Sequence, residues 1–233
     1  MNYNLKFTLP NSSIGQDIKK YTQSVYKEIY GASINPNPDE FIYLEQNNEI
    51  YASFGITYRE NKKLFSECYL DAPLENEENK LGNYVTSEVG SFISIKNGFG
   101  LQLYKLLPYI LYEKNSFYAL VTLTRKVYTL FNRLNFRTSY LIGATEDRVP
   151  VRNIWGTFYE TNPRTFILDV KNSCTDRSLL QHARKLDIEI CELGQILNKK
   201  IFPKPYFQEP FATVHTPVPE ALQSYSNKVH PKY

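Results

Sequence analysis

The sequence is poor in the side chains that bind metals and form disulfides. Its 233 residues include three histidines and three cysteines, and Cys68, Cys174 and Cys191 lie far apart. At these distances the histidines and cysteines lack the close spacing of a zinc site, and an odd number of scattered cysteines provides no disulfide framework. We therefore expect no metal site, and we interpret the three cysteines as packing residues in a reducing compartment.

Charge of one sign and long apolar runs are also lacking. The formal net charge is only +3, whereas a nucleic-acid-binding domain usually carries a dense basic face, so nucleic acid is not an expected partner. The longest apolar run, LLPYILY, is far shorter than the ~20 residues that span a bilayer. The opening residues MNYNLKFTLPNSS lack the apolar core of a secretory signal. We expect a cytoplasmic protein without a membrane span.

The chain does contain ample material for a packed core, because 42% of its residues are hydrophobic and 15% are aromatic. In the first third, apolar spacing predicts a helix over residues 14–30, begun by a capping box at Ser13-x-x-Gln16. Two strands flank a turn at Gln46–Asn48, and LFSECYLD (64–71) reads as a third strand of this meander. The acidic segment APLENEENKLGN (72–83) reads as a loop.

The middle of the chain alternates strands and helices. The strand YVTSEVGSFISI leads through KNGFG into an apolar helix that contains Pro108, and the buried strand FYALVTLT leads into the helix RKVYTLFNRLN. YLIG and TFILDV supply late strands. This order predicts an α/β fold with a mixed sheet. We divide the chain into an α/β domain over 1–170, a helical extension packed on it over 171–201, and a proline-rich tail over 202–233.

The glycine turn between the strand and the apolar helix is a candidate phosphate site. Gly98 and Gly100 allow close approach to unpaired amides at a helix start, where the helix dipole favours negative charge. The same two glycines also fit an ordinary tight turn. The layout resembles the GNAT acyltransferase superfamily, whose pattern here is Gln or Arg, two residues, Gly, one residue, then Gly or Ala. The sequence departs from that pattern at Ile95. The segment assigned to the donor is Ile95, Lys96, Asn97, Gly98, Phe99 and Gly100.

Five segments in order resemble the thermostable hemolysin family, a GNAT-like group. They are YGASINPNPDEFIYL (30–44), LFSECYLDAPLEN (64–76), SEVGSFIS (87–94), TLTRKVYTLFNRLNF (122–136) and WGTFYETNPR (155–164). EVGSF is also similar to a stretch of the acyl-homoserine-lactone synthases, which are related to the N-acyl amino acid synthases. The resemblance implies a GNAT-like, splayed mixed sheet flanked by helices, and acyl transfer from a pantetheine thioester to a small amine. It favours an acyl carrier protein over coenzyme A as donor and implies no tightly bound cofactor.

The resemblance directs attention to a few residues. Glu88 is the candidate base that removes a proton from the amine, and the alternative is a structural glutamate bonded to a neighbouring strand or to Arg125. Glu67 is a second candidate base. Tyr128 either protonates the departing thiolate or packs in the core. Amides near residues 92–95 become oxyanion donors if that strand bulges.

Further residues are assigned to the two substrates. Arg125, which directly follows the buried strand, is the best of several basic residues for donor binding, and the basic stretch 125–152 suits an acidic carrier protein. Phe92, Trp155 and Tyr159 are the candidate acyl pocket, and the alternative for Trp155 is closing the core. Two functions from other classes stay open: a membrane-damaging protein, as the family name suggests, and a non-catalytic binding module.

Overall fold

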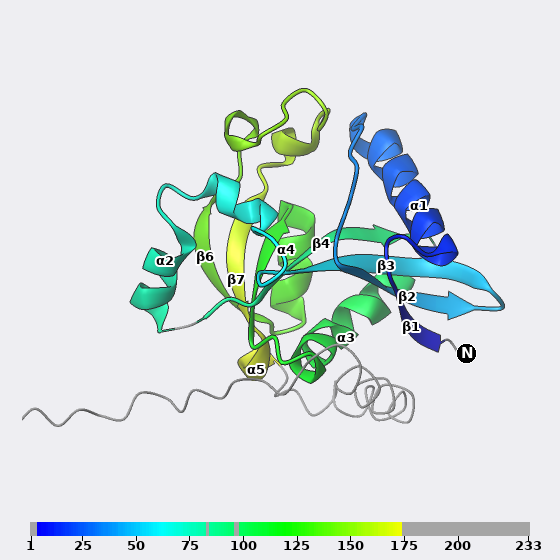
Figure 1. The fold of residues 1–233 in the computed structure, drawn as a ribbon, viewed down its shortest axis with the longest axis horizontal. Coiled ribbons are helices and arrows are strands. Elements are labelled where there is room, and N and C mark those ends of the chain that lie inside the picture. The colour runs from blue at the N-terminus through cyan, green and yellow to red at the C-terminus, as the bar shows by residue number, and fades with distance from the viewer. Residues whose placement is uncertain (1–3, 83, 96–97, 174–233) are drawn as a thin grey trace, which may run out of the picture. The chain divides into compact units, whose positions relative to one another are not determined.

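The computed structural model describes residues 4–82, 84–95 and 98–173 (Figure 1). The predicted helical extension over 171–201 lies outside these residues, except at its start, where α5 spans Val170–Ser173. The predicted tail over 202–233 lies entirely outside them.

The described strands form one seven-stranded sheet in the order β1-β2-β3-β4-β5-β7-β6. The neighbours β4 and β5 are parallel, and every other neighbouring pair is antiparallel. The predicted mixed α/β sheet is therefore confirmed. The strand bounds are β1 (Asn4–Thr8), β2 (Glu40–Gln46), β3 (Glu49–Tyr58), β4 (Ser87–Ser94), β5 (Tyr118–Leu123), β6 (Arg137–Gly143) and β7 (Arg164–Asp169).

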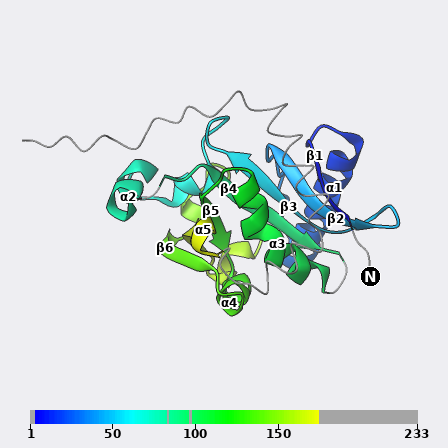
Figure 2. The same ribbon diagram turned by 90° about the horizontal axis from the view of Figure 1, so that it is seen from below.

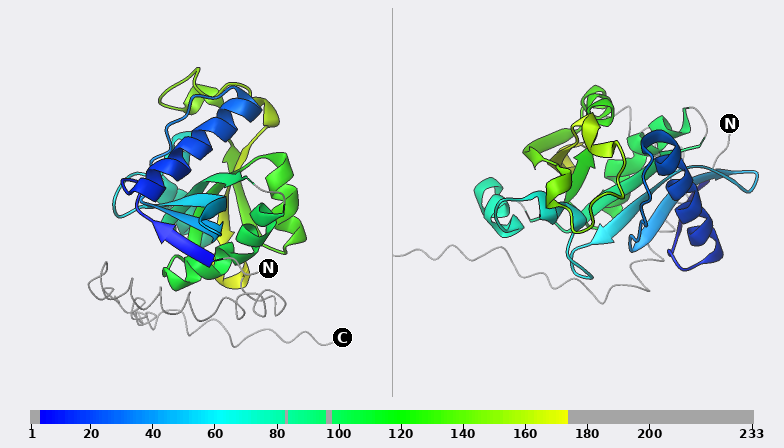
Figure 3. Two further views of the ribbon diagram at one scale, coloured as in Figure 1. Left: turned by 90° about the vertical axis from the view of Figure 1, so that its right-hand side faces the viewer. Right: turned by 90° about the horizontal axis from the view of Figure 1, so that it is seen from above.

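Helices cover both faces of this sheet (Figure 3). The helix α1 (Ser13–Tyr30) packs on one face through Ile18, which joins Phe41 and Tyr43 of β2. The helices α3 (Phe99–Glu113) and α4 (Arg125–Arg133) lie on the opposite face (Figure 2). The shorter helices are η1 (Phe65–Tyr69), α2 (Leu74–Leu81), η2 (Glu146–Arg148) and η3 (Phe158–Thr161).

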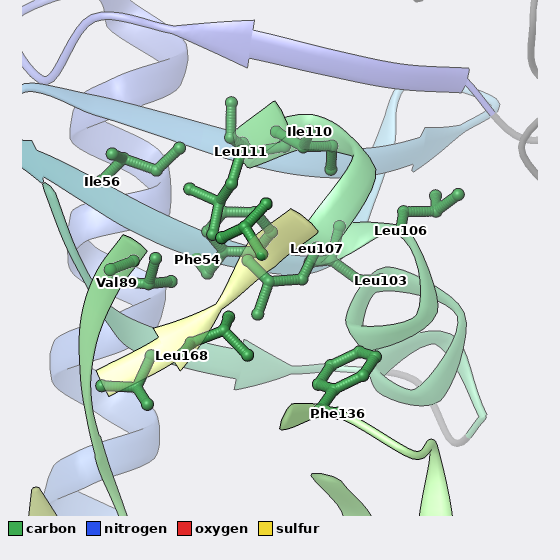
Figure 4. Packing of buried hydrophobic residues seen from close by; sticks show 14 of the residues in the cluster. Phe54, Ile56, Val89, Leu103, Leu106, Leu107, Ile110, Leu111, Phe136 and Leu168 are labelled. Atoms are coloured by element: carbon green, nitrogen blue, oxygen red, sulfur yellow. The ribbon is translucent and has the colours of Figure 1, made fainter. Parts of the chain in front are cut away.

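The main core lies between the sheet and α3. Side chains of α3 that recur at helical spacing meet apolar side chains of the central strands, as Figure 4 shows for Leu107 against Phe54 and Leu168. Burial of a large aliphatic side chain contributes roughly 1.5–3 kcal/mol, so this stripe accounts for the position of α3. The buried residues of α3 are Leu103, Leu106, Leu107, Pro108, Ile110 and Leu111.

Several predicted elements are confirmed with small shifts. Ser12, and not Ser13, caps α1, because its Oγ accepts the amide hydrogen of Gly15 at 2.9 Å. The predicted turn between β2 and β3 is confirmed, with Asn47 and Asn48 both at positive φ, a backbone that short hairpins require. The sequence did not reveal β1, a short edge strand that pairs with β2.

Two predictions between β3 and β4 are wrong. Residues 65–69 form the 3₁₀ helix η1, because the edge of β3 that a third meander strand would need is occupied by β4. The segment predicted as an acidic loop contains α2, which Arg59 ties to the sheet through Glu75 and Glu78. Both elements depend on long-range contacts that no local pattern displays.

The sheet separates between β4 and β5. Their pairing covers Ser87–Val89 against Ala119–Val121, after which β4 continues alongside β3 and β5 continues alongside β7. Just beyond this point β4 bulges, because Ser91 and Phe92 together lie opposite the single residue Phe54, and Ser91 has a φ of 54°. The splay and the bulge set the geometry of the candidate site.

Candidate active site

A cavity of about 520 Å³ opens on the α1 side of the sheet, next to the separation of β4 and β5. Its floor comes from the central strands, and its walls come from α1, η1 and two loop segments, residues 34–38 and 150–158. Most of the wall is apolar or aromatic, which suits a ligand with an apolar body. The aromatic lining residues are Tyr26, Phe65, Tyr69, Trp155 and Phe158, and the polar and charged lining residues include Thr57, Ser66, Glu88, Ser91 and Thr122.

Glu88 is the one buried carboxylate on this cavity wall among the described residues, with 8% of its surface exposed. The amide of Ser66 donates to its Oε1 and Oε2 at 3.1 and 3.2 Å, and the Ser66 hydroxyl donates to Oε1 at 2.5 Å. Burial raises the pKa of Glu88, whereas the hydrogen bonds from Ser66 lower it. A buried carboxyl with a raised pKa beside a cavity is suited to proton transfer.

The second candidate base has a structural partner. The Glu67 side chain accepts the amide hydrogen of Leu64 at 2.9 Å and so closes the first turn of η1. Glu67 is not among the residues that line the cavity. Of the two carboxylates, Glu88 is the one that lines the cavity.

The predicted oxyanion region is divided by the bulge. The amide of Ile95 donates to the carbonyl of Tyr51 at 2.8 Å, so it is already used within the sheet. The bulged pair Ser91 and Phe92 interrupts the ladder, and Ser91 lies on the cavity wall. The bulge therefore meets the cavity at Ser91, one residue before the predicted segment 92–95, and the oxyanion role of that segment stays a prediction.

The glycine turn begins α3, as predicted, with Gly98 at a φ of 89° as the N-terminal cap. The amide of Gly100 donates to Ser94 Oγ at 3.0 Å. A phosphate bound at that amide would have to displace the serine hydroxyl. Phe99 packs its ring against Tyr51, while Lys96 and Asn97 lie outside the described residues. Phosphate binding at this turn stays a prediction.

The α4 residues lie on the other face of the sheet. Tyr128 stacks flat on Phe166, with ring centroids 4.7 Å apart and an interplanar angle of 8°. This geometry agrees with the packing alternative, and protonation of the thiolate by Tyr128 stays a prediction. Arg125 is exposed at the first turn of α4 and has no hydrogen bond or ion pair to Glu88 among the described residues.

Of the three residues proposed for an acyl pocket, Trp155 and Tyr159 lie together and Phe92 lies apart from them. Phe92 stacks on Tyr104 of α3 with centroids 4.5 Å apart, on the α3 side of the sheet. Trp155 lies in the cavity wall against Phe65. Tyr159 lies behind Trp155, where its hydroxyl shares a 2.7 Å hydrogen bond with that of Tyr69.

The sequence did not single out Ser66, Thr122 or the loop prolines as site residues. Pro36 and Pro38 are buried in the cavity wall. From the sequence they indicate only the end of a helical pattern. The one available signal was Thr122, a polar residue inside the mainly apolar run FYALVTLT. Ser66 carried no signal, because its role depends on a contact with a residue 22 positions away.

The loop that holds Trp155 contacts the end of α1, where the amide of Thr157 donates to the carbonyl of Tyr30 at 2.8 Å and Gly156 lies against the same carbonyl. Gly156 has a φ of 53°, and a Cβ there would lie 1.9 Å from the carbonyl oxygen of Tyr30. We expect Gly156→Ala to lower the free energy of unfolding by about 2–4 kcal/mol in urea denaturation. Gly82→Ala is the control, because Gly82 has positive φ but open space around its Cβ, so it should lose only about 1 kcal/mol. Equal losses would contradict the contact.

Two features are absent from the described part of the chain. No group of three or more histidine, cysteine, aspartate or glutamate side chains is placed to hold a metal ion there. Within the same ranges, no helix has both the length and the apolarity needed to cross a membrane.

The protein has a GNAT-like α/β fold, in which the mixed sheet separates between its two parallel strands, β4 and β5. The structure resembles the CoA-dependent acyl-homoserine lactone synthase BjaI, solved with SAM and isopentyl-CoA, with a TM-score of 0.52 and 7% identity over 84% of this chain and 100% of that chain. It also resembles FeeM, an N-acyl amino acid synthase from uncultured soil microbes, with a TM-score of 0.52 and 14% identity over 73% of this chain and 93% of that chain.

The chain belongs to the thermostable hemolysin family, whose model matches residues 10–174. No curated protein sequence matches it. The resemblance drawn from the sequence motifs and the GNAT-like fold class are both confirmed.

Proposed function

We propose that the protein is an N-acyltransferase that moves an acyl group from a pantetheine thioester directly to an amine. The amine nitrogen attacks the thioester carbonyl carbon, the new C–N bond forms and the C–S bond breaks. Glu88 takes the proton that the amine loses, and the sulfur leaves as a thiolate that is then protonated. No tightly bound cofactor takes part.

The observation that carries this proposal is the position of Glu88. Its carboxyl is buried on the wall of the cavity, one residue before the point where β4 leaves β5. A thioester inserted into the splay would place its carbonyl carbon next to an amine held in the cavity. Burial raises the pKa of Glu88 toward the range in which a carboxylate is an effective base.

The bulge of β4 supports the same chemistry. A bulged residue is left out of the regular ladder, so its backbone can be aimed at a ligand. At Ser91 and Phe92 this backbone lies between Glu88 and the start of α3. Amides preorganised around a thioester oxygen are worth roughly 3–4 kcal/mol to a tetrahedral transition state.

A carrier protein is the donor that we propose. Four basic side chains at α4 and the start of β6 are exposed and make no ion pair within the described ranges: Arg125, Lys126, Arg133 and Arg137. An acidic carrier protein would be drawn to this basic face. Arg148, by contrast, is already paired with Asp71.

Charge reversal on the basic face should separate the two donors. We expect Arg133→Glu with Arg137→Glu to lower kcat/KM for acyl-carrier protein about tenfold, because two attractive contacts become repulsive. Turnover of acyl-CoA should change little. Lys20→Glu on α1, on the other face of the sheet, is the control and should affect neither donor. An equal loss with both donors would remove the support for a carrier protein.

The test of the function is thiol release from acyl-carrier protein and from acyl-CoA in the presence of a mixed pool of amines. Amine-dependent release, with the acylated amine identified by mass spectrometry, is the expected result. The name of the hemolysin family suggests membrane damage as the competing function. Leakage of dye from liposomes is therefore measured in parallel. Leakage without turnover would contradict the proposal. A protein with neither property, and no thermal shift with thioesters, would be a binding module instead.

A further inference from the structure

The Glu88 carboxylate is bound mainly by Ser66, through both its backbone and its side chain. The amide of Ser66 donates to both carboxylate oxygens and its hydroxyl donates to Oε1. The backbone of Phe65, the preceding residue of η1, adds a weaker hydrogen bond that also lowers the pKa of Glu88. Ser66 is itself fully buried and lies in η1, whereas Glu88 lies in β4. The orientation of Glu88 relative to the cavity is therefore set by a neighbouring helix and not by its own strand.

Two more hydroxyls extend this contact across the sheet. Ser66 Oγ lies 2.7 Å from Thr122 Oγ1 on β5, and Thr122 Oγ1 lies 2.9 Å from Thr165 Oγ1 on β7. Each hydroxyl has one hydrogen to donate. Because an ionised Glu88 accepts the hydrogen of Ser66, Thr122 donates to Ser66 and Thr165 donates to Thr122. All three hydroxyl dipoles then point toward the carboxylate.

This chain of hydroxyls is not an exit route for protons. Its far end, Thr165, is fully buried. A proton taken up by Glu88 has no path to solvent through Thr165 and must leave through the cavity. The effect of the chain on Glu88 is electrostatic and geometric, because aligned hydroxyls polarise one another and stabilise the charge that they face.

We propose that Ser66, supported by Thr122 and Thr165, is the positioning residue that favours the charged form of the Glu88 carboxylate and aims it at the cavity. The part of this inference that concerns acyl transfer rests on the proposed function. The part that concerns Glu88 itself rests only on the buried contacts.

Other charged and titratable groups around Glu88 act on it as well. From η1 these are Glu67, whose charge raises the pKa of Glu88, and Cys68 and Tyr69, whose own pKa values are raised by burial and by the nearby Glu88. Lys62 and Lys63 line the same cavity. Burial and Glu67 therefore oppose ionisation of Glu88, and the hydrogen bonds of Ser66 favour it.

The test is the titration of the Glu88 carboxyl, followed by NMR in protein labelled with ¹³C at glutamate Cδ. Glu88→Gln lacks this signal and so identifies it. We expect Ser66→Ala to raise the pKa of Glu88 by about one unit, because a hydrogen bond to the charged form is lost. Thr122→Val should give a smaller rise, and Thr165→Val a smaller one again.

Ser53→Ala is the matched control. Ser53 is a fully buried serine on β3 whose hydroxyl has no hydrogen-bond partner within the described part of the chain. Its replacement should leave the Glu88 titration unchanged. If Ser66→Ala remains folded and the Glu88 titration equals that of the wild type, the proposal is overturned.

Activity adds a second readout. A higher pKa for Glu88 means that the base form appears only at higher pH, so the acidic limb of kcat/KM should move upward by the same amount in Ser66→Ala. The NMR titration needs no substrate. A shift in the NMR titration of a protein that shows no acyl transfer would support the role of Ser66 and count against the proposed function alone.

Discussion

Replacing Glu88 with glutamine is expected to lower the rate of acyl transfer by about 10²–10⁴-fold, the usual contribution of a positioned general base. The side chain keeps its size, and its amide oxygen can still accept hydrogen bonds from Ser66. What it loses is the capacity to take a proton from the amine. The measurement is steady-state thiol release at saturating donor, with wild type and variant compared across pH 6–9.

The stability of this variant should not fall. The pKa of Glu88 is raised in the folded protein. Its contribution to stability is therefore fully present below the unfolded pKa and is lost as pH rises through the folded pKa. Wherever the pH exceeds the folded pKa, the ionised carboxylate opposes folding, and glutamine removes that opposition. We expect an equal or higher Tm at pH 7, so that loss of turnover cannot be ascribed to unfolding.

Glu67→Gln is the matched control for Glu88→Gln. Its side-chain oxygen can still accept the hydrogen bond from the amide of Leu64, so η1 should stay intact and turnover should persist. If Glu88→Gln retained wild-type turnover while Glu67→Gln lost it, the general base would be Glu67 and the proposed role of Glu88 would be wrong.

Replacing Lys114 with methionine is expected to cause the largest loss of stability. Lys114 Nζ lies 2.7 Å from Glu40 Oε1, and the two side chains are only 11% and 8% exposed. The Tyr58 hydroxyl also donates to Glu40, and the Lys114 ammonium faces the ring of Phe7. This pair joins the end of α3 to the start of β2. Removing the cation leaves the buried Glu40 carboxylate without a positive partner, which lowers the free energy of unfolding by about 3–5 kcal/mol.

Urea unfolding at pH 7 measures this loss, and a double variant tests its cause. Lys114→Met with Glu40→Gln removes both charges and should regain most of the free energy of unfolding. Lys20→Met breaks an exposed pair with Asp17, whose side chains are 75% and 55% exposed, and should change stability by less than about 0.5 kcal/mol. A double variant as unstable as Lys114→Met would mean that packing, and not the unpaired charge, causes the loss.

Local pattern was sufficient for the elements that bury one regular face. The apolar spacing of residues 14–30 corresponds to α1, and the apolar run FYALVTLT corresponds to β5. The glycine turn lies at the start of α3, as predicted. Glu88 could be placed on a strand next to that turn, since strand, turn and helix follow one another in the chain.

Local pattern failed where the partner lies far away in the chain. LFSECYLD has the composition of a strand, but β3 already pairs with β4, and the segment instead folds into η1 so that Ser66 meets Glu88. The sequence could not show that Phe92 lies apart from Trp155 and Tyr159, because that separation depends on which face of the sheet each side chain contacts. The order of the strands, and the face of the sheet on which each side chain lies, depend on how distant strands pair by hydrogen bonds.

The amino-acid order alone determined that the protein has an α/β core, a glycine turn before an apolar helix, and a glutamate on the strand leading to it. These features follow from side-chain periodicity and backbone preference, which act within a few residues. The tertiary structure decided that Glu88 is buried against Ser66 and faces a cavity built partly from residues 34–38 and 150–158. Such contacts form only when distant segments are packed together, because burial and desolvation are properties of the assembled fold.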